Sequence, residues 1–340
     1  MNTAIIGASG YAGEETVRLL SRHPRLRLTA VTSRQNKGKT LGSVVGGLTR
    51  YRDLQFEDLS PAEVASRAEL FVLAVPHGVA AEYAVPLREA GKLVVDLSAD
   101  FRIHDPAVYA EFYGHPHAAP AYLPQAVYAL PELHAEAIKK SDLLASPGCY
   151  PTSILLALAP ALQAGWLDLE TIAITSLSGV TGAGKKAEIP LLFGEIGESL
   201  RAYSLPKHRH LSEIEQEIAL LAGKPVQVSF VPHLVPINRG ILTTITARLM
   251  DRNLAPAAAQ AAYEAFYRDK PFVRVLDQAT LPEVKNVART NFAEIALRID
   301  PRTGRLILIS AIDNLVKGTA GQAIQAINLR LGYPEEEGLL

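Results

Sequence analysis

The only cysteine of this 340-residue chain lies in the segment Ser146-Pro-Gly-Cys149-Tyr-Pro-Thr152. The apolar run 153–159 behind it predicts a buried helix, so we expect Cys149 beside the N-terminus of that helix. Unpaired amide N–H groups and the helix dipole favour an anion there, and they can lower the pKa of a thiol toward the nucleophilic thiolate. Because free cysteine is also commonly a small buried hydrophobe, this segment alone leaves both interpretations open.

A second group of reactive side chains, Lys207-His208-Arg209-His210, precedes another predicted helix. We expect Ser212 to be the N-cap of that helix and Glu215 to complete a capping box. Cations at a helix N-terminus oppose the dipole, so helix stability does not account for them. Arg209 could bind a carboxylate or phosphate, and one histidine could act as acid or base; the alternative is a solvated basic turn.

A glycine motif, Gly7-x-x-Gly10-x-x-Gly13, follows a short apolar strand at 3–6 and opens a helix at 14–22. Glycines let the backbone approach a pyrophosphate, and the helix N-terminus receives its charge. The pattern therefore predicts a dinucleotide site, with an ordinary tight turn as the alternative. Its residues are Gly7, Ser9, Gly10, Tyr11, Ala12 and Gly13.

The second predicted strand ends in Ser33-Arg34-Gln35, where an acidic residue would bind a ribose 2′-hydroxyl. Because an arginine at this place suits a 2′-phosphate, the three residues favour NADP(H) over NAD, unless Arg34 is simply a solvated charge. A further Gly-rich, basic loop at 179–186 lacks the Walker spacing. We expect it to lie against nicotinamide or an anionic substrate.

Composition limits the possible partners. With 48% hydrophobic residues, 20% charged residues and a net charge of -1, the chain gives no overall reason to expect nucleic acid or an anionic membrane. No run approaches the ~20 apolar residues of a membrane span, and the N-terminus lacks the features of a signal peptide. One cysteine excludes four-cysteine and Cys2His2 zinc frameworks, so we expect no metal site and a reducing cytoplasm.

The order of predicted elements indicates two domains. Strands at 26–32, 70–75 and 93–97, with a helix at 78–90, predict a parallel, doubly wound Rossmann-type sheet. Segment 101–130 is too irregular for a long element, and we expect an ordered loop. Strands at 171–178, 227–236, 240–249, 292–300 and 306–312, with helices at 255–267 and 318–331, predict an α+β domain. Its mixed, largely antiparallel sheet could pack one face on helices and the other on a second subunit. The fold class is α/β.

Four motifs together closely resemble the N-acetyl-gamma-glutamyl-phosphate reductases of arginine biosynthesis. They are Asp96-Leu-Ser-Ala-Asp-Phe-Arg102, the Cys149 segment, His208-Arg-His-x-x-Glu-Ile-Glu-Gln and Asp313-Asn-Leu-Val-Lys-Gly-x-Ala-Gly-Gln322. The likeness spans essentially the whole chain and extends to the aspartate-semialdehyde dehydrogenases, which share a two-domain plan. It departs at Ser212, where many members carry proline.

The resemblance implies an NADP-binding domain at 1–148 plus about 315–340 and a catalytic and dimerisation domain at 149–314. It also implies an active site in the cleft between them, and a homodimer or homotetramer. The reaction would be NADPH-dependent reduction of N-acetyl-glutamyl 5-phosphate to N-acetyl-glutamate 5-semialdehyde and phosphate.

Residue roles also follow from the resemblance. Cys149 would form a thioester with the small acyl-phosphate substrate, and His210, with His208 as the alternative, would supply the proton. Asn314 would lie near the nicotinamide. The residues that would contact the substrate are Arg102, His208, Arg209 and Glu213.

Two alternatives remain open at this point. The lysine-pathway reductase, which acts on a carrier-bound aminoadipyl phosphate, shares most of these motifs. A non-catalytic NADP-binding redox sensor would use Cys149 as a switch or as a plain core residue.

Overall fold

The computed structural model describes residues 1–185 and 187–340, so residue 186 of the predicted basic loop lies outside the described residues. The chain divides into two compact units. One contains Met1–Pro147 with Thr319–Leu340, and the other contains Gly148–Gly318. The polypeptide therefore leaves the first unit just before Cys149 and returns to it for its last helix.

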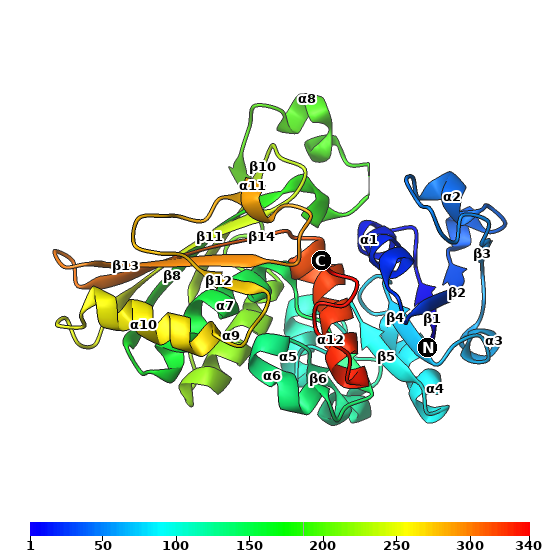
Figure 1. Ribbon diagram of the computed structural model, residues 1–340, viewed down its shortest axis with the longest axis horizontal. Coiled ribbons are helices and arrows are strands. Elements are labelled where there is room, and N and C mark those ends of the chain that lie inside the picture. Colours follow the sequence, from blue (N-terminus) through cyan, green and yellow to red (C-terminus); the bar gives the residue numbers. More distant parts are fainter. Residues whose placement is uncertain (186) are drawn as a thin grey trace. The chain divides into compact units, whose positions relative to one another are not determined.

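The first unit is built on a seven-stranded parallel sheet in the order β3-β2-β1-β4-β5-β7-β6 (Figure 1). Its strands are β1 (Asn2–Ile6), β2 (Arg27–Thr32), β3 (Phe56–Glu57), β4 (Leu70–Leu73), β5 (Leu93–Asp96), β6 (Val127–Tyr128) and β7 (Leu143–Ala145). Alternate residues of β4 belong to two separate core clusters, with Val72 in one and Phe71 in the other. Both faces of the sheet are thus covered, which explains why its central strands are apolar throughout.

Helices pack on both faces of this sheet. Helices α1 and α12 contribute to one core cluster, and α3 and α4 contribute to the other. The helices of the unit are α1 (Tyr11–Arg22), α2 (Leu41–Val44), α3 (Pro61–Ala65), α4 (Ala80–Glu89), α5 (Pro106–Tyr113), α6 (Pro131–Ile138) and α12 (Gly321–Leu331), with short 3-10 turns at Arg34–Asn36 and Pro120–Gln125.

Helix α5 corrects the prediction that 101–130 is only a loop. Asp105 caps the helix by accepting the backbone N–H of Ala107 at 2.7 Å, Pro106 occupies its first turn, and Gly114 ends it with φ +79°. These are ordinary helix start and stop signals. The surrounding prolines and aromatic residues hid them, because they interrupt the apolar periodicity on which the prediction depended.

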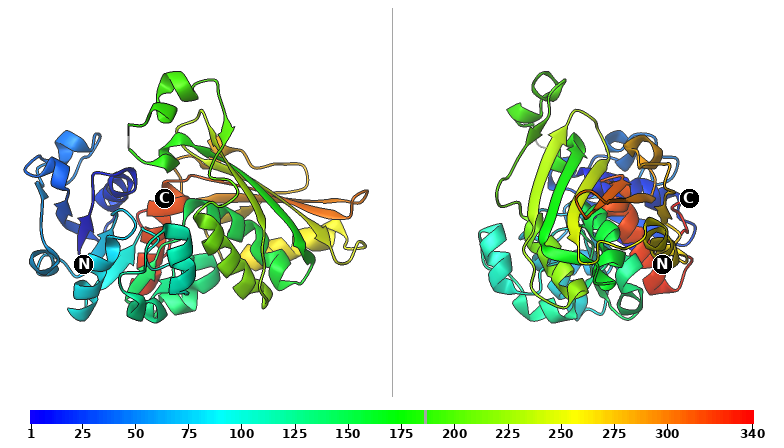
Figure 2. Two further views of the ribbon diagram at one scale, coloured as in Figure 1. Left: turned by 180° about the vertical axis from the view of Figure 1, so that it is seen from behind. Right: turned by 90° about the vertical axis from the view of Figure 1, so that its left-hand side faces the viewer.

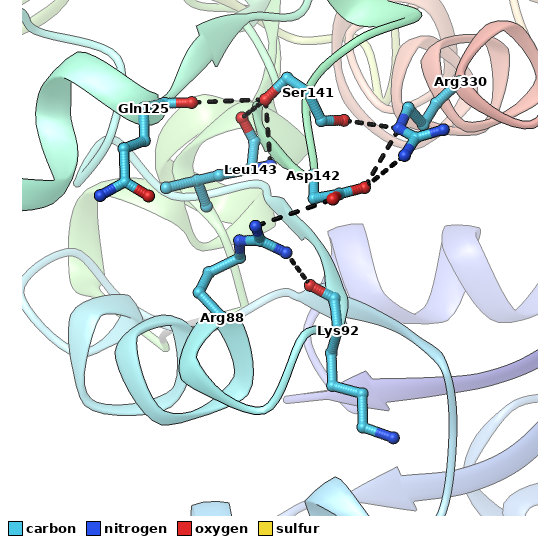
Figure 3. A network of polar contacts seen from close by, with 7 residues as sticks. All are labelled: Arg88, Lys92, Gln125, Ser141, Asp142, Leu143 and Arg330. Atoms are coloured by element: carbon cyan, nitrogen blue, oxygen red, sulfur yellow. Dashed lines mark hydrogen bonds and ion pairs between the residues drawn. The ribbon is translucent and has the colours of Figure 1, made fainter.

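Asp142, just before β7, fixes the returning helix α12 to the sheet (Figure 3). Arg330 of α12 lies 2.6 Å from one carboxylate oxygen of Asp142 and also donates to the backbone carbonyl of Ser141 at 2.8 Å. Arg88 of α4 lies 3.8 Å from the other oxygen. One carboxylate thereby joins helices that are distant in sequence, which makes the C-terminal segment an integral part of the first unit.

The second unit holds a mixed seven-stranded sheet in the order β12-β13-β14-β11-β8-β10-β9. Only the β12–β13 and β8–β10 pairs are parallel. Asp300 pairs with Arg305 at the end of the β13–β14 hairpin, as the alternating pattern predicted. The strands are β8 (Leu167–Gly179), β9 (Arg201–Ala202), β10 (Ser229–Val235), β11 (Ile241–Leu249), β12 (Val273–Val275), β13 (Ala293–Asp300) and β14 (Arg305–Ile312).

One face of this sheet carries helices (Figures 1 and 2). Ser153 of helix α7 accepts a hydrogen bond from Ser310 through its carbonyl at 2.8 Å, and its hydroxyl lies 2.7 Å from that of Thr243. Because side chains alternate along a strand, Thr244 points to the opposite face. The helices are α7 (Cys149–Gln163), α8 (Phe193–Ile196), α9 (His210–Ala222), α10 (Pro256–Tyr267) and α11 (Val284–Val287), with 3-10 turns at Val180–Ala183 and Ile189–Leu191 and a π-helical turn at Val316–Ala320.

The two architectures confirm the predicted fold class, a Rossmann-type parallel sheet plus an α+β unit with a mixed, largely antiparallel sheet. Within the described residues, no helix is both long and apolar enough to cross a membrane.

Candidate active site

Cys149 is the first residue of α7, and Gly148 is its N-cap. The thiol residue is partly exposed, whereas every residue from Tyr150 to Leu162 is buried. Burial holds the rest of this 15-residue helix in place and leaves its reactive end accessible. The start of a helix is also the end at which the dipole favours the thiolate.

His210 and Glu213 lie against the residue that precedes the cysteine. A Cβ added to Gly148 would be 2.7 Å from Nε2 of His210 and 3.0 Å from Oε2 of Glu213. The backbone N–H of Gly148 donates to Oε1 of the fully buried Glu213 at 2.8 Å. Both residues belong to the first turn of α9, so an imidazole nitrogen and a carboxylate are brought to the start of the cysteine helix.

His208 occupies a different environment from His210. Burial lowers the pKa of His208 to about 4, and the charge of Arg209 adds to the effect. Nδ1 of His208 accepts the backbone N–H of His210 at 3.1 Å, and its ring packs edge-on against Tyr150, Tyr203 and Phe230. His208 is therefore neutral near pH 7 and serves as a cap for the first turn of α9.

The tyrosines around His208 keep their protons. The hydroxyl of Tyr203 donates to that of Tyr150 at 3.0 Å, and burial raises both pKa values, that of Tyr203 to about 12. They are neutral hydrogen-bonding groups at the start of the cysteine helix, to which Tyr150 belongs.

The predicted capping box at Ser212 and Glu215 is wrong. Helix α9 begins two residues earlier, at His210, so Ser212 lies inside the helix and donates to the Arg209 carbonyl at 2.9 Å. Glu215 instead accepts the backbone N–H of Val228 at 3.0 Å. The imidazole of His208 supplies the cap, which standard capping preferences do not include. Arg209 itself is exposed at the N-cap.

Asn314 ties two loops of the second unit together. Its side-chain oxygen accepts the N–H of Gly240 at 2.7 Å, and its amide donates to the hydroxyl of Thr181 at 3.0 Å. Thr181 belongs to the Gly-rich loop, whose backbone rests on the turn at 237–240. These bonds give Asn314 a supporting part in shaping the loop.

The glycine turn of the first unit has the form that a dinucleotide requires. Gly7 adopts φ +85°, and a Cβ there would be 2.4 Å from the carbonyl oxygen of Ala74; one on Gly13 would be 2.5 Å from that of Gly7. A Cβ on Gly10 would meet nothing nearer than 4.0 Å, and no side chain caps helix α1 at Gly10. The backbone is thus tightly packed at two glycines and open at the third, which fits the approach of a pyrophosphate.

A hydrogen-bonded chain links this turn to a cation absent from the sequence predictions. The hydroxyls of Ser9 and Ser33 lie 2.8 Å apart, Asn36 donates to Ser33 at 3.3 Å, and Lys39 donates to Asn36 at 3.2 Å. Arg34 is 78% exposed and lies 3.9 Å from Asp58, and Gln35 is exposed. The sequence feature that could have indicated Lys39 is a basic loop in which Lys37 and Lys39 are two residues apart. The spacing alone could not show which of the two lysines reaches Asn36.

Arg102 is buried in the first unit. Its Nε donates to the carbonyl of Ser146 at 2.7 Å, and Nη2 donates to that of Leu97 at 2.9 Å. Nearby, burial raises the pKa of Asp96 to about 7, and the charge of Asp100 adds to the effect. The guanidinium therefore holds the backbone three residues before Cys149.

The structure thus brings Cys149, His210 and Glu213 together through Gly148, and it places His208 and Asn314 in supporting positions in the same unit. The glycine turn, the 33–39 segment and Arg102 belong to the other unit. Among the residues described, no group of three or more His, Cys, Asp or Glu side chains could hold a metal ion.

A nucleotide-type sheet, an α+β unit and a cysteine at a helix start define the class of the semialdehyde dehydrogenases. The family model described as "Semialdehyde dehydrogenase, NAD binding domain" matches residues 2–141, and "Semialdehyde dehydrogenase, dimerisation domain" matches residues 149–314.

Curated relatives narrow the assignment. A protein of Desulfotalea psychrophila is 50% identical, over 99% of this chain and 97% of the relative, and one of Akkermansia muciniphila is 49% identical, over 100% and 98%. Both are named N-acetyl-gamma-glutamyl-phosphate reductase. The chain therefore belongs to the N-acetyl-gamma-glutamyl-phosphate reductase family, which confirms the resemblance found in the sequence.

Solved structures show the same fold at low identity. Aspartate semialdehyde dehydrogenase II of Vibrio cholerae, complexed with ASA, matches with a TM-score of 0.73 and 19% identity, covering 97% of this chain and 98% of that one. The enzyme of Candida albicans with NADP matches with a TM-score of 0.71 and 16% identity, covering 96% and 97%.

The contact at Gly148 predicts the effect of one added methyl group. Gly148→Ala should lower kcat by about 100-fold, because His210 and Glu213 must move away from the cysteine helix, and displacements near 1 Å carry costs of this order. Gly194→Ala, where a Cβ meets nothing within 4 Å, is the control. Steady-state kinetics with a thermal melt of each variant measures both; equal kcat values for the two folded variants would contradict the prediction.

Proposed function

We infer that the protein is an enzyme that reduces N-acetyl-glutamyl 5-phosphate to N-acetyl-glutamate 5-semialdehyde and phosphate with NADPH, a step of arginine biosynthesis. The names of its close relatives support the reaction. The single structural observation that carries the chemistry is the close approach of His210 and Glu213 to Gly148, directly before the only cysteine of the chain.

The proposed nucleophile is the thiolate of Cys149. His210, acting as a base, accepts the thiol proton, and the sulfur attacks the acyl carbon of the substrate. A C–S bond forms, the C–O bond to phosphate breaks, and phosphate leaves with the bonding pair. The product of this half-reaction is a thioester on Cys149.

Bound NADPH supplies the hydride that reduces the thioester carbon. His210, now protonated, donates its proton toward the developing alkoxide. As the hemithioacetal collapses, His210 takes back the hydroxyl proton, the C–S bond breaks, the aldehyde is released and Cys149 returns to the thiolate. His208 is the weaker candidate for this proton transfer, because burial lowers its pKa to about 4 and its Nδ1 is engaged by the backbone of His210.

Substrate anions need cations, and two arginines remain our candidates. Arg209 is exposed at the start of α9, one residue from His210, so it suits a carboxylate or phosphate. Arg102 brings a buried positive charge to the segment before Cys149 while it holds the Ser146 carbonyl. For Glu213, the bond to Gly148 favours positioning of the cysteine helix over direct substrate binding.

NADP(H) is the cofactor that the first unit favours. The glycine turn Gly7–Gly13 would receive the pyrophosphate, and Ser33, Arg34 and Lys39 would surround a 2′-phosphate. Asn314 would hold the Gly-rich loop in position, and that loop would lie against the nicotinamide.

The two alternatives lose their support. The curated relatives described above carry the arginine-pathway name, not that of a carrier-dependent reductase. A redox sensor would not require His210 and Glu213 beside the cysteine helix. We propose the reducing cytoplasm as the place of action, since the nucleophile must remain a thiol.

We propose that a homodimer forms through the face of the second sheet opposite α7. Thr244 lies at the middle of that face, paired with Thr175 of β8 and Ile309 of β14, and all three are at least partly exposed. The family model covering this unit is named a dimerisation domain.

Thr244→Arg should convert the dimer to monomer, because it places a long cation in the middle of the proposed interface. Asn253→Arg, at an exposed turn, is the control. Sedimentation velocity distinguishes them; a dimer that survives Thr244→Arg would refute this face.

The reverse assay tests the reaction directly. With phosphate and N-acetyl-glutamate semialdehyde the enzyme should reduce NADP, and Cys149→Ser should abolish turnover while NADPH binding is retained. His210→Asn should reduce kcat more than His208→Asn does. Good activity with a carrier-bound aminoadipate semialdehyde and none with the free N-acetyl compound would overturn the proposed substrate.

Cofactor choice has its own matched set. Lys39→Gln and Arg34→Asp should each weaken NADPH binding by about tenfold or more and leave NADH binding nearly unchanged, since each removes a charge-assisted hydrogen bond. Lys37→Gln is the control, because the charge of Lys37 contributes to lowering the pKa of Glu63 in α3 instead. Titration calorimetry measures the Kd values, and equal loss for both nucleotides would reject the 2′-phosphate assignment.

A further inference from the structure

Asp313, at the start of the turn Asp313–Gly318, is the centre of a network of hydrogen bonds and an ion pair that has no part in the proposed reaction. Asp313 is fully buried at the end of β14. Its Oδ1 accepts the backbone N–H groups of Leu315 and Val316 at 2.8 and 2.9 Å, and its Oδ2 accepts that of Arg289 at 2.6 Å. Nη1 of Arg239 lies 3.6 Å from the same oxygen. One carboxylate thus joins three segments that are distant in sequence.

The other end of this turn lies on the nucleophile. The N–H of Gly318 donates to the carbonyl of Asp313 at 2.8 Å, a spacing typical of the π-helical turn found here. A Cβ on Gly318 would be 2.7 Å from Cβ of Cys149 and 3.2 Å from its Cα. The backbone of Gly318 therefore packs directly against the cysteine and limits where its side chain can lie.

Arg239 connects the same carboxylate to the Gly-rich loop. It belongs to the turn at 237–240, whose carbonyls accept backbone N–H groups of Val180 and Thr181. A Cβ on Gly179 would be 2.8 Å from the backbone nitrogen of Arg239. The side chain of Arg239 is only 15% exposed, so its charge is partly desolvated. The opposite charge of Asp313 compensates for this loss of hydration.

We propose that Asp313 is a positioning residue for Cys149. By capping the turn and holding it to Arg289 and Arg239, its carboxylate presses Gly318 against the cysteine and sets the location of the thiol. The proposal rests on the proposed function only in taking Cys149 as the nucleophile.

The lone cysteine provides a readout that needs no turnover. The rate of alkylation by iodoacetamide, followed between about pH 5 and 9, reports on Cys149 alone. In Asp313→Asn the amide nitrogen cannot accept the Arg289 N–H, so the turn loosens. We expect an alkylation rate changed by about tenfold or a displaced pH profile, and kcat lower by about 100-fold, with KM and the Kd of NADPH nearly unchanged.

Two further variants keep the test decisive. Asp300→Asn makes the same change at the hairpin turn that opens β14, where the carboxylate binds Arg302 and Thr303, and should behave as the wild type. Gly318→Ala keeps the Asp313 carboxylate and adds a Cβ that would lie 2.7 Å from Cβ of Cys149 and 3.3 Å from the Asp313 carbonyl oxygen; it should reproduce the altered alkylation profile.

A folded Asp313→Asn or Gly318→Ala protein with the wild-type profile would overturn the proposal. If Asp313→Asn does not fold, a wild-type alkylation profile in Gly318→Ala still overturns the proposal, because the contact of Gly318 with Cys149 is the step through which Asp313 would act. Failure of the proposed function would show differently, as a wild type that does not turn over the semialdehyde while the alkylation differences persist.

Discussion

The close approach of the first turn of α9 to Gly148, at the start of α7, is the constraint on which the site depends. Glu213 is fully buried and needs a hydrogen-bond donor, because an uncompensated buried carboxylate is costly. The N–H at the start of α7 is that donor, and it is also a group that no residue of α7 can satisfy. This bond therefore satisfies both the buried carboxylate and the N–H at the helix start, and it joins α9 to the cysteine helix. The contact leaves no room for a side chain at position 148.

His208 and His210 are both buried, and their hydrogen bonds and neighbours distinguish them. His208 lies among aromatic rings, stays neutral, and caps the turn on which His210 stands. His210 faces the start of the cysteine helix. A supporting residue and the proposed acid–base residue thus come from one short motif, and the bond from the His210 N–H to Nδ1 of His208 assigns the supporting part to His208.

Charged side chains also fix the main chain near Cys149 through hydrogen bonds to backbone groups. Arg102 donates to main-chain carbonyls before Cys149, and Asp313 accepts main-chain N–H groups in the turn against Cys149. Both charges meet backbone dipoles, and such bonds are directional and charge-assisted. Within the second unit, the backbone of Gly318 in this turn packs against Cys149.

The sequence by itself determined the fold class of the two units and the start of α7 at Cys149, and it supplied the candidate reactive side chains, because apolar periodicity, glycines and helix signals are local; it missed the short strands β3, β6, β7, β9 and β12. It missed α5 and misplaced the start of α9, since Asp105 was hidden among aromatics and the cap was an imidazole.

Only the tertiary structure decided that Glu213 binds Gly148, that Lys39 donates to Asn36, and that Gly318 lies on Cys149. The contacts of Glu213 with Gly148 and of Gly318 with Cys149 join residues that are far apart in the chain. The contact of Lys39 depends on the direction in which its side chain points. No spacing rule records such partners, because they are selected by packing and by the need to satisfy buried polar groups.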